Sequence, residues 1–451
     1  MSDERTGDDE QFKLERGALR SKKAVRLWQK GKYYWNKWAD KNKFAEIDFS
    51  FVDFSQYKEN PKPYFISFNS YHFPNGKISF YRSDFSKCHV DFNHTHYGNA
   101  DVSFREAILE DCFIRFDGAS FGSGNISFTD IDFRKAIISL EGVNFGQGNF
   151  RLNRCNLYYK SIIFEKCKFG DGEFSFEYIN LEKSHLYFGH TEFGEGSLTF
   201  KENNLTGSHI KLEFTKIKGN FIFEGNGTEE AAEEVSFKGT SFSHAVFLSG
   251  SFSCIIDLTA TQAKNHVDLS KLHCTLPRIE IYPFIWWATD PKDAARLRRL
   301  KELAEDNKHH EAALRFHADE MRAKRWHEFG FWASLLDMAF SGFSNYGQSV
   351  ARPAIWLFLT WVGLFLLYVA PDNGQWWIHS IAEKGIKAIV VILTSSLPFV
   401  SHAWKIRHEH LGELVGVPIP DWANLLTTVQ GIISFIFLFL IGLGLRNRFR
   451  I

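Results

Sequence analysis

The most constraining feature of the sequence is a pattern of apolar residues that recurs every 12 positions. From Phe104 to Leu212 each twelfth residue is Phe or Leu, and the residues five and ten positions after each of these are apolar as well. All 30 positions of this grid, which ends at Ile222, are apolar, although apolar residues make up only 44% of the chain. Chance gives such a run with a probability on the order of 10⁻¹¹. The grid also extends backward to Phe68, so the chain contains a long internal repeat.

Large apolar residues five positions apart do not fit the period of about 3.6 residues that a helix requires. They predict short strands separated by tight corners that return side chains to a common axis, which is a β-solenoid. The motif FGxG recurs every 24 residues, at 121, 145, 169 and 193. We therefore expect a right-handed β-helix with a 12/24-residue period over residues 44–272, in which 24 residues make one turn. Glycine is expected to supply the positive φ of the FGxG corner.

The five-residue spacing continues outside the main run, and we expect these side chains to point into the same core. They are Phe44, Phe49 and Phe54 before it, and Phe237, Phe242, Phe247 and Phe252 after the acidic segment 224–234. The pattern fades near Leu269 and Leu272, which marks the predicted end of the solenoid.

This spacing resembles that of the pentapeptide-repeat β-helix family, in which Leu or Phe at every fifth position points inward and a small residue stands two positions before it. Here the small residues are Gly124, Gly148, Gly172 and Gly196, which precede Ile126, Phe150, Phe174 and Leu198. Each unit has five plus five plus two residues rather than pure fives, and the resemblance covers about half of the chain. It implies a scaffold or docking surface. Some soluble members of the family mimic DNA and bind topoisomerases.

Chemistry-bearing motifs are not evident in the sequence. No nucleophile–base pair, phosphate-binding loop or paired-carboxylate signature stands out, so we predict that the protein is not an enzyme and uses no cofactor or metal. The six cysteines show no CxxC spacing and are expected to be small buried residues in a reducing compartment. Equal numbers of basic and acidic residues, 53 of each, make nucleic acid an unlikely partner.

The N-terminal arm, residues 1–43, is basic and aromatic. Eleven basic residues face two acidic ones between 11 and 43, with Tyr and Trp interleaved. Such a helix is typical of binding to a membrane surface, but it equally suits a cap that closes the solenoid with its aromatic face. The residues proposed for membrane contact are Lys22, Lys23, Arg26, Trp28, Trp35 and Trp38.

Residues 273–350 are predicted to form a helical hairpin and an interfacial linker, and residues 351–451 a membrane domain. The segments 353–370 and 425–445 carry no charge and are long enough to span a hydrocarbon layer of about 30 Å. Arg352 precedes the first segment, and Arg446 and Arg448 follow the second. The positive-inside rule then predicts a multi-pass protein of the bacterial cytoplasmic (inner) membrane with both termini in the cytoplasm.

A third apolar segment, residues 386–400, is too short to span and is predicted to be re-entrant. Span, re-entrant helix and span is the pore-module topology of two-transmembrane cation channels, which this segment resembles in topology but not in filter sequence. If a pore exists, Thr394, Ser395, Ser396 and Pro398 are the candidates for its narrow part. The alternative is an interfacial helix that only braces the two spans.

Three functions follow from these observations. The first is an oligomeric, channel-like membrane protein that is gated or recruited through its cytoplasmic β-helix. Because two spans cannot enclose a pore, it requires a homo-oligomer. The second is a non-conducting membrane-anchored scaffold that docks a protein partner on the β-helix surface. The third and weakest is a DNA-mimicking topoisomerase binder, which needs a strongly acidic solenoid face.

Overall fold

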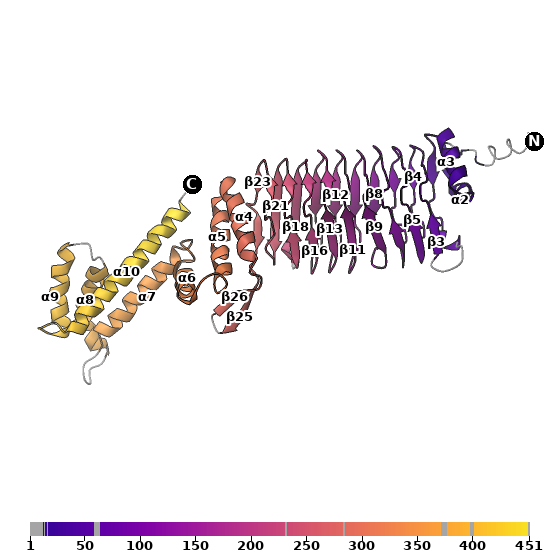
Figure 1. Cartoon of the computed structure of the whole chain (residues 1–451). Coiled ribbons are helices and arrows are strands. Elements are labelled where there is room, and N and C mark those ends of the chain that lie inside the picture. The colour runs from indigo at the N-terminus through magenta and orange to yellow at the C-terminus, as the bar shows by residue number, and fades with distance from the viewer. Residues whose placement is uncertain are drawn as a thin grey trace, which may run out of the picture. The chain divides into compact units, whose positions relative to one another are not determined.

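The repeat folds into a β-solenoid of about 10 turns, in which parallel strands stack one turn upon the next (Figure 1). Phe150 pairs with Phe174 and Phe174 with Leu198, which confirms the 24-residue turn. The computed structural model describes residues 12–449 except 13, 16, 58–63, 231, 283–284, 371–376 and 397–400. The chain divides into two units, Met1–Ala323, which contains the solenoid, and Lys324–Ile451, which is helical.

Each turn of the solenoid has four sides, and on two of these sides the chain forms regular strands. One side comprises β1 (Ala18–Arg20), β2 (Glu46–Asp48), β4 (Ile78–Ser79), β6 (Val102–Ser103), β8 (Ile126–Thr129), β10 (Phe150–Asn153), β12 (Phe174–Glu177), β15 (Leu198–Lys201), β18 (Phe221–Glu230), β21 (Val246–Phe252), β23 (Val267–Asp268) and β24 (Leu272–Cys274). The second comprises β3 (Tyr64–Ser67), β5 (Cys88–Asp91), β7 (Phe113–Arg115), β9 (Ile137–Glu141), β11 (Ser161–Glu165), β13 (His185–Gly189), β16 (His209–Lys211) and β19 (Glu234–Ser236).

The other two sides are held mainly by isolated bridges. Asn156 bridges Asp132 and Asn180 on one of them, and Asn144 bridges Ser120 and Lys168 on the other. The latter side becomes regular in later turns, where it forms β14 (Glu192–Phe193), β17 (Lys216–Ile217), β20 (Ser241–Phe242) and β22 (Gln262–Ala263). One short 3₁₀ helix, η1, covers Phe54–Gln56.

Phenylalanine side chains fill the interior as stacks that run along the solenoid axis. Phe145 lies 4.3 Å from Phe169, centroid to centroid, and Phe169 lies 4.5 Å from Phe193, with the rings nearly parallel. Phe164 and Phe188 form a second stack at 4.6 Å. Stacking at this spacing adds to the burial of large apolar surfaces. The excess of phenylalanine therefore reflects a repeating core position.

Small polar residues occupy the inner corners, where they bind the carbonyl oxygens of the turn before. The hydroxyl of Thr191 donates to the carbonyl of Phe164 at 2.9 Å, and that of Ser184 donates to Leu157 at 2.6 Å. Cys167 takes the same kind of position, with its thiol donating to Leu140 at 2.8 Å. All six cysteines are free, and five are buried, as predicted. Burial raises the pKa of Cys155 and Cys167 to about 12.

The glycines of the FGxG motif act by close approach rather than by positive φ. A Cβ on Gly148 or Gly172 would collide with the carbonyl oxygen of the glycine one turn before, and neither residue has positive φ. The left-handed corners instead carry larger residues such as Glu106 and Arg154. Our prediction for the FGxG corner therefore holds for Gly146, whose φ is +63°, but not for Gly148 or Gly172.

Three predicted core residues point outward. The turn from Leu198 to Phe221 spans 23 residues, so Phe221 and Phe223 are buried and Ile222 is not. Ile222 pairs with Phe247, which is 38% exposed because it lies on the same outer face. Phe44 is 82% exposed and precedes the first residues of its turn that face the core. Within a strand, a shift of one residue turns each side chain to the opposite face.

Two helices, α2 (Ser21–Gln29) and α3 (Lys32–Lys41), cover the N-terminal end of the solenoid (Figure 1). Trp28 stacks on Phe68 at 5.5 Å and Trp35 on Phe49 at 6.0 Å. Both tryptophans belong to the same buried cluster as the solenoid core. Of the two interpretations of the basic arm, the structure thus shows the cap.

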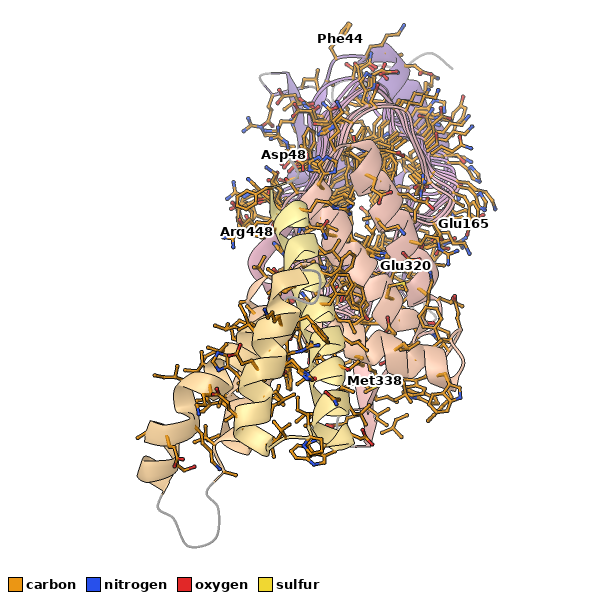
Figure 2. The ribbon with its side chains drawn as sticks, turned by 90° about the vertical axis from the view of Figure 1, so that its left-hand side faces the viewer. Phe44, Asp48, Glu165, Glu320, Met338 and Arg448 are labelled. Atoms are coloured by element: carbon orange, nitrogen blue, oxygen red, sulfur yellow. The ribbon has the colours of Figure 1, made fainter. Side chains whose placement is uncertain are left out.

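A helical hairpin, α4 (Asp293–Asp306) and α5 (His310–Lys324), covers the other end (Figure 1). The side chain of Asn307 accepts a hydrogen bond from the Val267 amide at 2.9 Å, and Arg296 lies 3.3 Å from Asp257. Glu320, labelled in Figure 2, is buried between the helices, where Lys301 reaches it at 2.8 Å. A small antiparallel pair that the sequence did not predict, β25 (Arg278–Tyr282) and β26 (Ile285–Ala288), precedes the hairpin.

The second unit consists of α6 (Phe331–Ser344), α7 (Ala351–Tyr368), α8 (Trp377–Ser396), α9 (Ser401–Val415) and α10 (Asp421–Arg448). By length and composition, α7 and α10 are each able to cross a membrane. Helix α7 contains residues 353–368 of the first predicted span, and α10 contains the whole of the second, residues 425–445. The predicted re-entrant segment 386–400 is different: up to Ser396 it is the second half of the 20-residue helix α8, which packs against α7, α9 and α10. The rest of it lies outside the described residues.

Tyr97 places a hydroxyl in the apolar stack, between Phe73 at 5.2 Å and Phe121 at 4.3 Å. Among the described residues this buried hydroxyl has no hydrogen-bond partner. Leaving such a group unpaired costs about 1–3 kcal/mol. We expect Tyr97→Phe to raise the free energy of unfolding by about 1 kcal/mol in urea titrations. Tyr71→Phe is the control and should not stabilise, because the Tyr71 hydroxyl donates to the Trp28 carbonyl at 3.3 Å.

Candidate functional site

The residues proposed for membrane contact in the N-terminal arm divide between core and surface. Trp28 and Trp35 are buried, and their indole N–H groups donate to the carbonyls of Ser67 at 2.8 Å and His72 at 2.9 Å. Both rings close the end of the solenoid and have almost no exposed surface for contact with a membrane. Trp38 is partly buried against the same core.

The three basic residues of that set remain at the surface. Lys22 and Arg26 are exposed, and Lys23 pairs with Glu15 at 2.8 Å. They lie on α2, whose opposite face carries the buried Ala24, Val25 and Leu27. These basic side chains thus form the solvent-exposed side of a capping helix.

The residues proposed to line a pore lie at the C-terminal end of α8. Ser395 and Ser396 are buried within the helical unit, and the hydroxyl of Thr394 donates to the Val390 carbonyl of its own helix at 2.7 Å. Pro398 lies outside the described residues. The two serines thus pack between helices of one chain, and their proposed role in a pore formed by several chains stays a prediction.

Ser396 is the centre of a buried polar cluster that joins three helices. It accepts a hydrogen bond from the indole N–H of Trp361 at 3.0 Å and lies 3.1 Å from the hydroxyl of Ser434. The amide of Gln430 donates to the carbonyl of Ile392 at 2.8 Å. Two atoms of this region, the Ser395 hydroxyl and Gln430 Oε1, are buried with no partner among the described residues. Sequence reasoning missed Gln430 and Ser434, although both interrupt an apolar helix.

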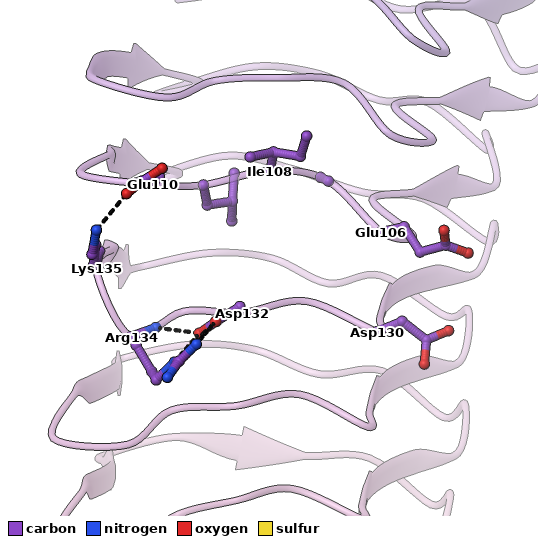
Figure 3. Close-up of a pocket in the computed structure, with 9 residues that line it drawn as sticks. Glu106, Ile108, Glu110, Asp130, Asp132, Arg134 and Lys135 are labelled. Carbon is purple, nitrogen blue, oxygen red and sulfur yellow. Dashed lines mark hydrogen bonds and ion pairs between the residues drawn. The ribbon is translucent and has the colours of Figure 1, made fainter.

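On the solenoid, a cleft of about 550 Å³ lies between two successive turns (Figure 3). Its lining comes from the turns that carry Ile108 and Asp132, and the Ile108 side chain is 47% exposed. The lining residues are Glu106, Ala107, Ile108, Leu109, Glu110, Asp130, Asp132, Arg134 and Lys135.

The cleft exists because the backbone ladder is interrupted at this point. In neighbouring turns the amide of Phe85 donates to Ile108, and that of Phe133 donates to Asn156. The equivalent bond from Leu109 to Asp132 is not formed, nor is the bond from the Asp132 amide to Ala107. The Leu109 amide, the Ala107 carbonyl, and the amide and carbonyl of Asp132 thus lack the ladder partners that the equivalent groups of other turns have.

Ion pairs between turns frame this opening. Lys135 pairs with Glu110 across it, and Arg154 binds Asp130 at 2.6 Å. The hydrogen bond from Lys135 lowers the pKa of Glu110, and that from Arg154 lowers the pKa of Asp130. Asp132 pairs with Arg134 on its own turn at 2.6 Å (Figure 3). Each acidic residue of the rim is paired with a basic one, so the cleft favours binding through backbone groups and apolar contact over binding of a free ion.

The interrupted ladder predicts locally fast hydrogen exchange. The amides of Leu109 and Asp132 should exchange at least about fivefold faster than those of Phe85 and Phe133, since one ladder bond contributes about 1 kcal/mol. Exchange followed by fragmentation mass spectrometry on the full chain resolves these sites. Equal protection of the two pairs of amides would contradict an open cleft.

Among the described residues, no cluster of three or more His, Cys, Asp or Glu is arranged to hold a metal ion. No protein-family model, curated protein or solved structure matches this chain.

Proposed function

We propose that this protein is a membrane-anchored scaffold, with α7 and α10 in the bilayer and the solenoid as a docking surface for a protein partner. The observation that carries the proposal is where the apolar surface lies. The apolar window of α7 is only 17% buried within the chain, and that of α10 is 33% buried. A core helix of a soluble protein would be mostly buried, whereas lipid is a suitable neighbour for such faces.

Aromatic and aliphatic side chains make up these outward faces. Phe358 on α7 is 61% exposed and Phe439 on α10 is 62% exposed. The basic residues lie at one end of both helices, with Arg352 at the start of α7 and Arg446 and Arg448 at the end of α10. The positive-inside rule then supports cytoplasmic termini in a bacterial inner membrane. A right-handed coil related to the pentapeptide repeats is part of the same proposal.

The solenoid suits a docking role because its interior is filled and both of its ends are capped. Its outer faces are therefore the surfaces available for recognition. The cleft at Ile108 offers unpaired backbone groups beside an exposed apolar side chain. This chemistry fits an extended peptide segment of a protein partner.

A DNA mimic is less well supported. Arg82, Glu106, Asp130 and Arg154 follow one another along a single corner of the solenoid and pair with each other. A corner on which acidic residues are paired with basic ones does not form the continuous acidic face that mimicry of DNA requires.

The second candidate remains an oligomeric channel. The observation that favours it is the polar cluster, because buried polar groups within membrane helices often mark a path for ions. Gln430 Oε1 and the Ser395 hydroxyl lack partners in the described part of a single chain. A homo-oligomer would be required, since α7 and α10 alone cannot enclose a pore.

Ion flux in liposomes that contain the purified full chain separates the two candidates. The scaffold predicts that K⁺, Na⁺ and Cl⁻ flux equals that of protein-free liposomes at every protein density. Flux that rises with density and changes in Gln430→Leu would overturn the scaffold and support the channel. A Thr428→Leu variant is the matched control, because Thr428 is an exposed residue of the same helix.

A further inference from the structure

Helix α6 has its polar and apolar faces reversed relative to a soluble surface helix. Ser334, Asp337 and Ser344 point into the unit and are buried. The large apolar residues face away from it: Phe331 (61% exposed), Trp332 (77%), Leu335 (38%), Leu336 (72%) and Phe340 (36%). A soluble protein rarely exposes such a continuous apolar stripe.

Asp337, on the inward polar face of α6, is held by hydrogen bonds, and these fix the rotation of the helix about its own axis. Arg325 reaches Asp337 at 2.7 Å and Tyr346 at 3.0 Å, and the Tyr346 hydroxyl donates to Asp337 at 2.9 Å. All three residues are buried. Turning the helix so that its apolar face points inward would break this triad and leave a buried arginine without its carboxylate, which is costly.

The exposed stripe continues onto the helices assigned to the bilayer. Phe343 of α6 packs edge-on against Trp356 of α7 at 5.4 Å and against Phe437 of α10 at 5.5 Å. Arg352, in the first turn of α7, donates to the Ser341 carbonyl of α6 at 3.2 Å. Helix α6 therefore lies at the start of α7, where a chain enters the bilayer. Trp and Phe on one side of such a helix are typical of residues at the lipid interface.

We propose that α6 is an interfacial helix, lying in the plane of the membrane with Phe331, Trp332, Leu335 and Leu336 among the lipid acyl chains near the headgroups. The proposal rests on the membrane anchoring proposed for α7 and α10, and adds a second kind of lipid contact. Its ligand is the surface of the leaflet in which α7 begins. Because the triad of Arg325, Asp337 and Tyr346 fixes the rotation of α6, the apolar face of the helix points toward the lipid.

Depth-dependent quenching tests this placement. The native thiols give little background, because five are buried and burial raises the pKa of the sixth, Cys274, to about 12. Single-cysteine probes would be placed by Leu336→Cys on α6, Phe358→Cys on α7 and Glu305→Cys on α4. Each variant of the full chain is labelled with an environment-sensitive fluorophore and reconstituted in phosphatidylcholine–phosphatidylglycerol vesicles. The vesicles carry nitroxide lipids with the spin label near the headgroup or near the bilayer centre.

We expect the probe at Leu336 to be quenched at least twofold more by the shallow nitroxide than by the deep one. The probe at Phe358 should be quenched more by the deep nitroxide, and the probe at Glu305 by neither. No quenching at Leu336 together with quenching at Phe358 would overturn the interfacial role of α6 and leave the anchor intact. Deep quenching at Leu336 would also overturn it. No quenching at Phe358 would instead overturn the proposed anchoring itself.

Discussion

Replacing Phe164 by alanine is expected to lower the free energy of unfolding of the solenoid by about 3–5 kcal/mol. Phe164 is 1% exposed and lies 4.6 Å from Phe188 and 5.9 Å from Phe169, measured between ring centroids. Its removal leaves a cavity between turns that are fixed by backbone ladders on both sides. Such a site collapses little, so both the transfer term and the cavity term apply. Urea denaturation of the full chain in detergent, followed by circular dichroism at strand wavelengths, measures the loss.

The neighbouring Ile163→Ala is the matched control. Ile163 belongs to the same strand, β11, but is 45% exposed on the outer face. Its replacement should change the free energy of unfolding by no more than about 0.5 kcal/mol. Comparable losses for the two variants would show that Phe164 is not part of a tightly packed stack.

Asp337→Ala is expected to destabilise the helical unit by about 3–5 kcal/mol, because it leaves the Arg325 guanidinium buried without a counter-charge. The two side chains meet at 2.7 Å and are 10% and 7% exposed. The loss of stability is measured by heating the full chain in nanodiscs and following proteolytic cleavage between α5 and α7.

The exposed pair of Lys387 and Glu413, at 3.2 Å, provides the comparison within the same unit. Glu413→Ala should destabilise the unit far less than Asp337→Ala, because solvent screens an exposed ion pair. The double variant Arg325→Met with Asp337→Leu should recover much of the stability lost in Asp337→Ala, since it removes both charges. A double variant less stable than Asp337→Ala would argue that the charge of Arg325 serves another purpose.

Much of the solenoid could be predicted because its core repeats. Grid positions such as Phe104, Leu157 and Phe174 are buried as expected. The FGxG spacing favoured a turn of 24 residues over one of 12, and the strand register confirms it. The prediction became inaccurate where a turn gains or loses a residue, as at Ile222 and Phe247, because periodicity by itself does not show a one-residue change in turn length.

Other features depend on contacts between distant residues and could not be predicted from local sequence. The cleft arises from two missing ladder bonds next to Leu109 and Asp132, although the apolar pattern there is regular. The buried pair of Arg325 and Asp337 reversed the faces of α6, which a pattern of apolar residues alone would have turned toward the core. Ser395 and Ser396 were predicted to line a pore from their place between two spans, but that place did not show that both are buried or that Ser396 contacts Trp361 and Ser434.

Alkaline carbonate extraction of membranes from cells that express the full chain tests the central claim most directly. High pH strips peripheral proteins, whereas a protein held by α7 and α10 remains in the bilayer, because transfer of their exposed apolar faces to water is unfavourable. We expect the protein to stay in the membrane pellet at pH about 11 and to be released only by detergent. Release into the supernatant by carbonate alone would contradict membrane anchoring by α7 and α10.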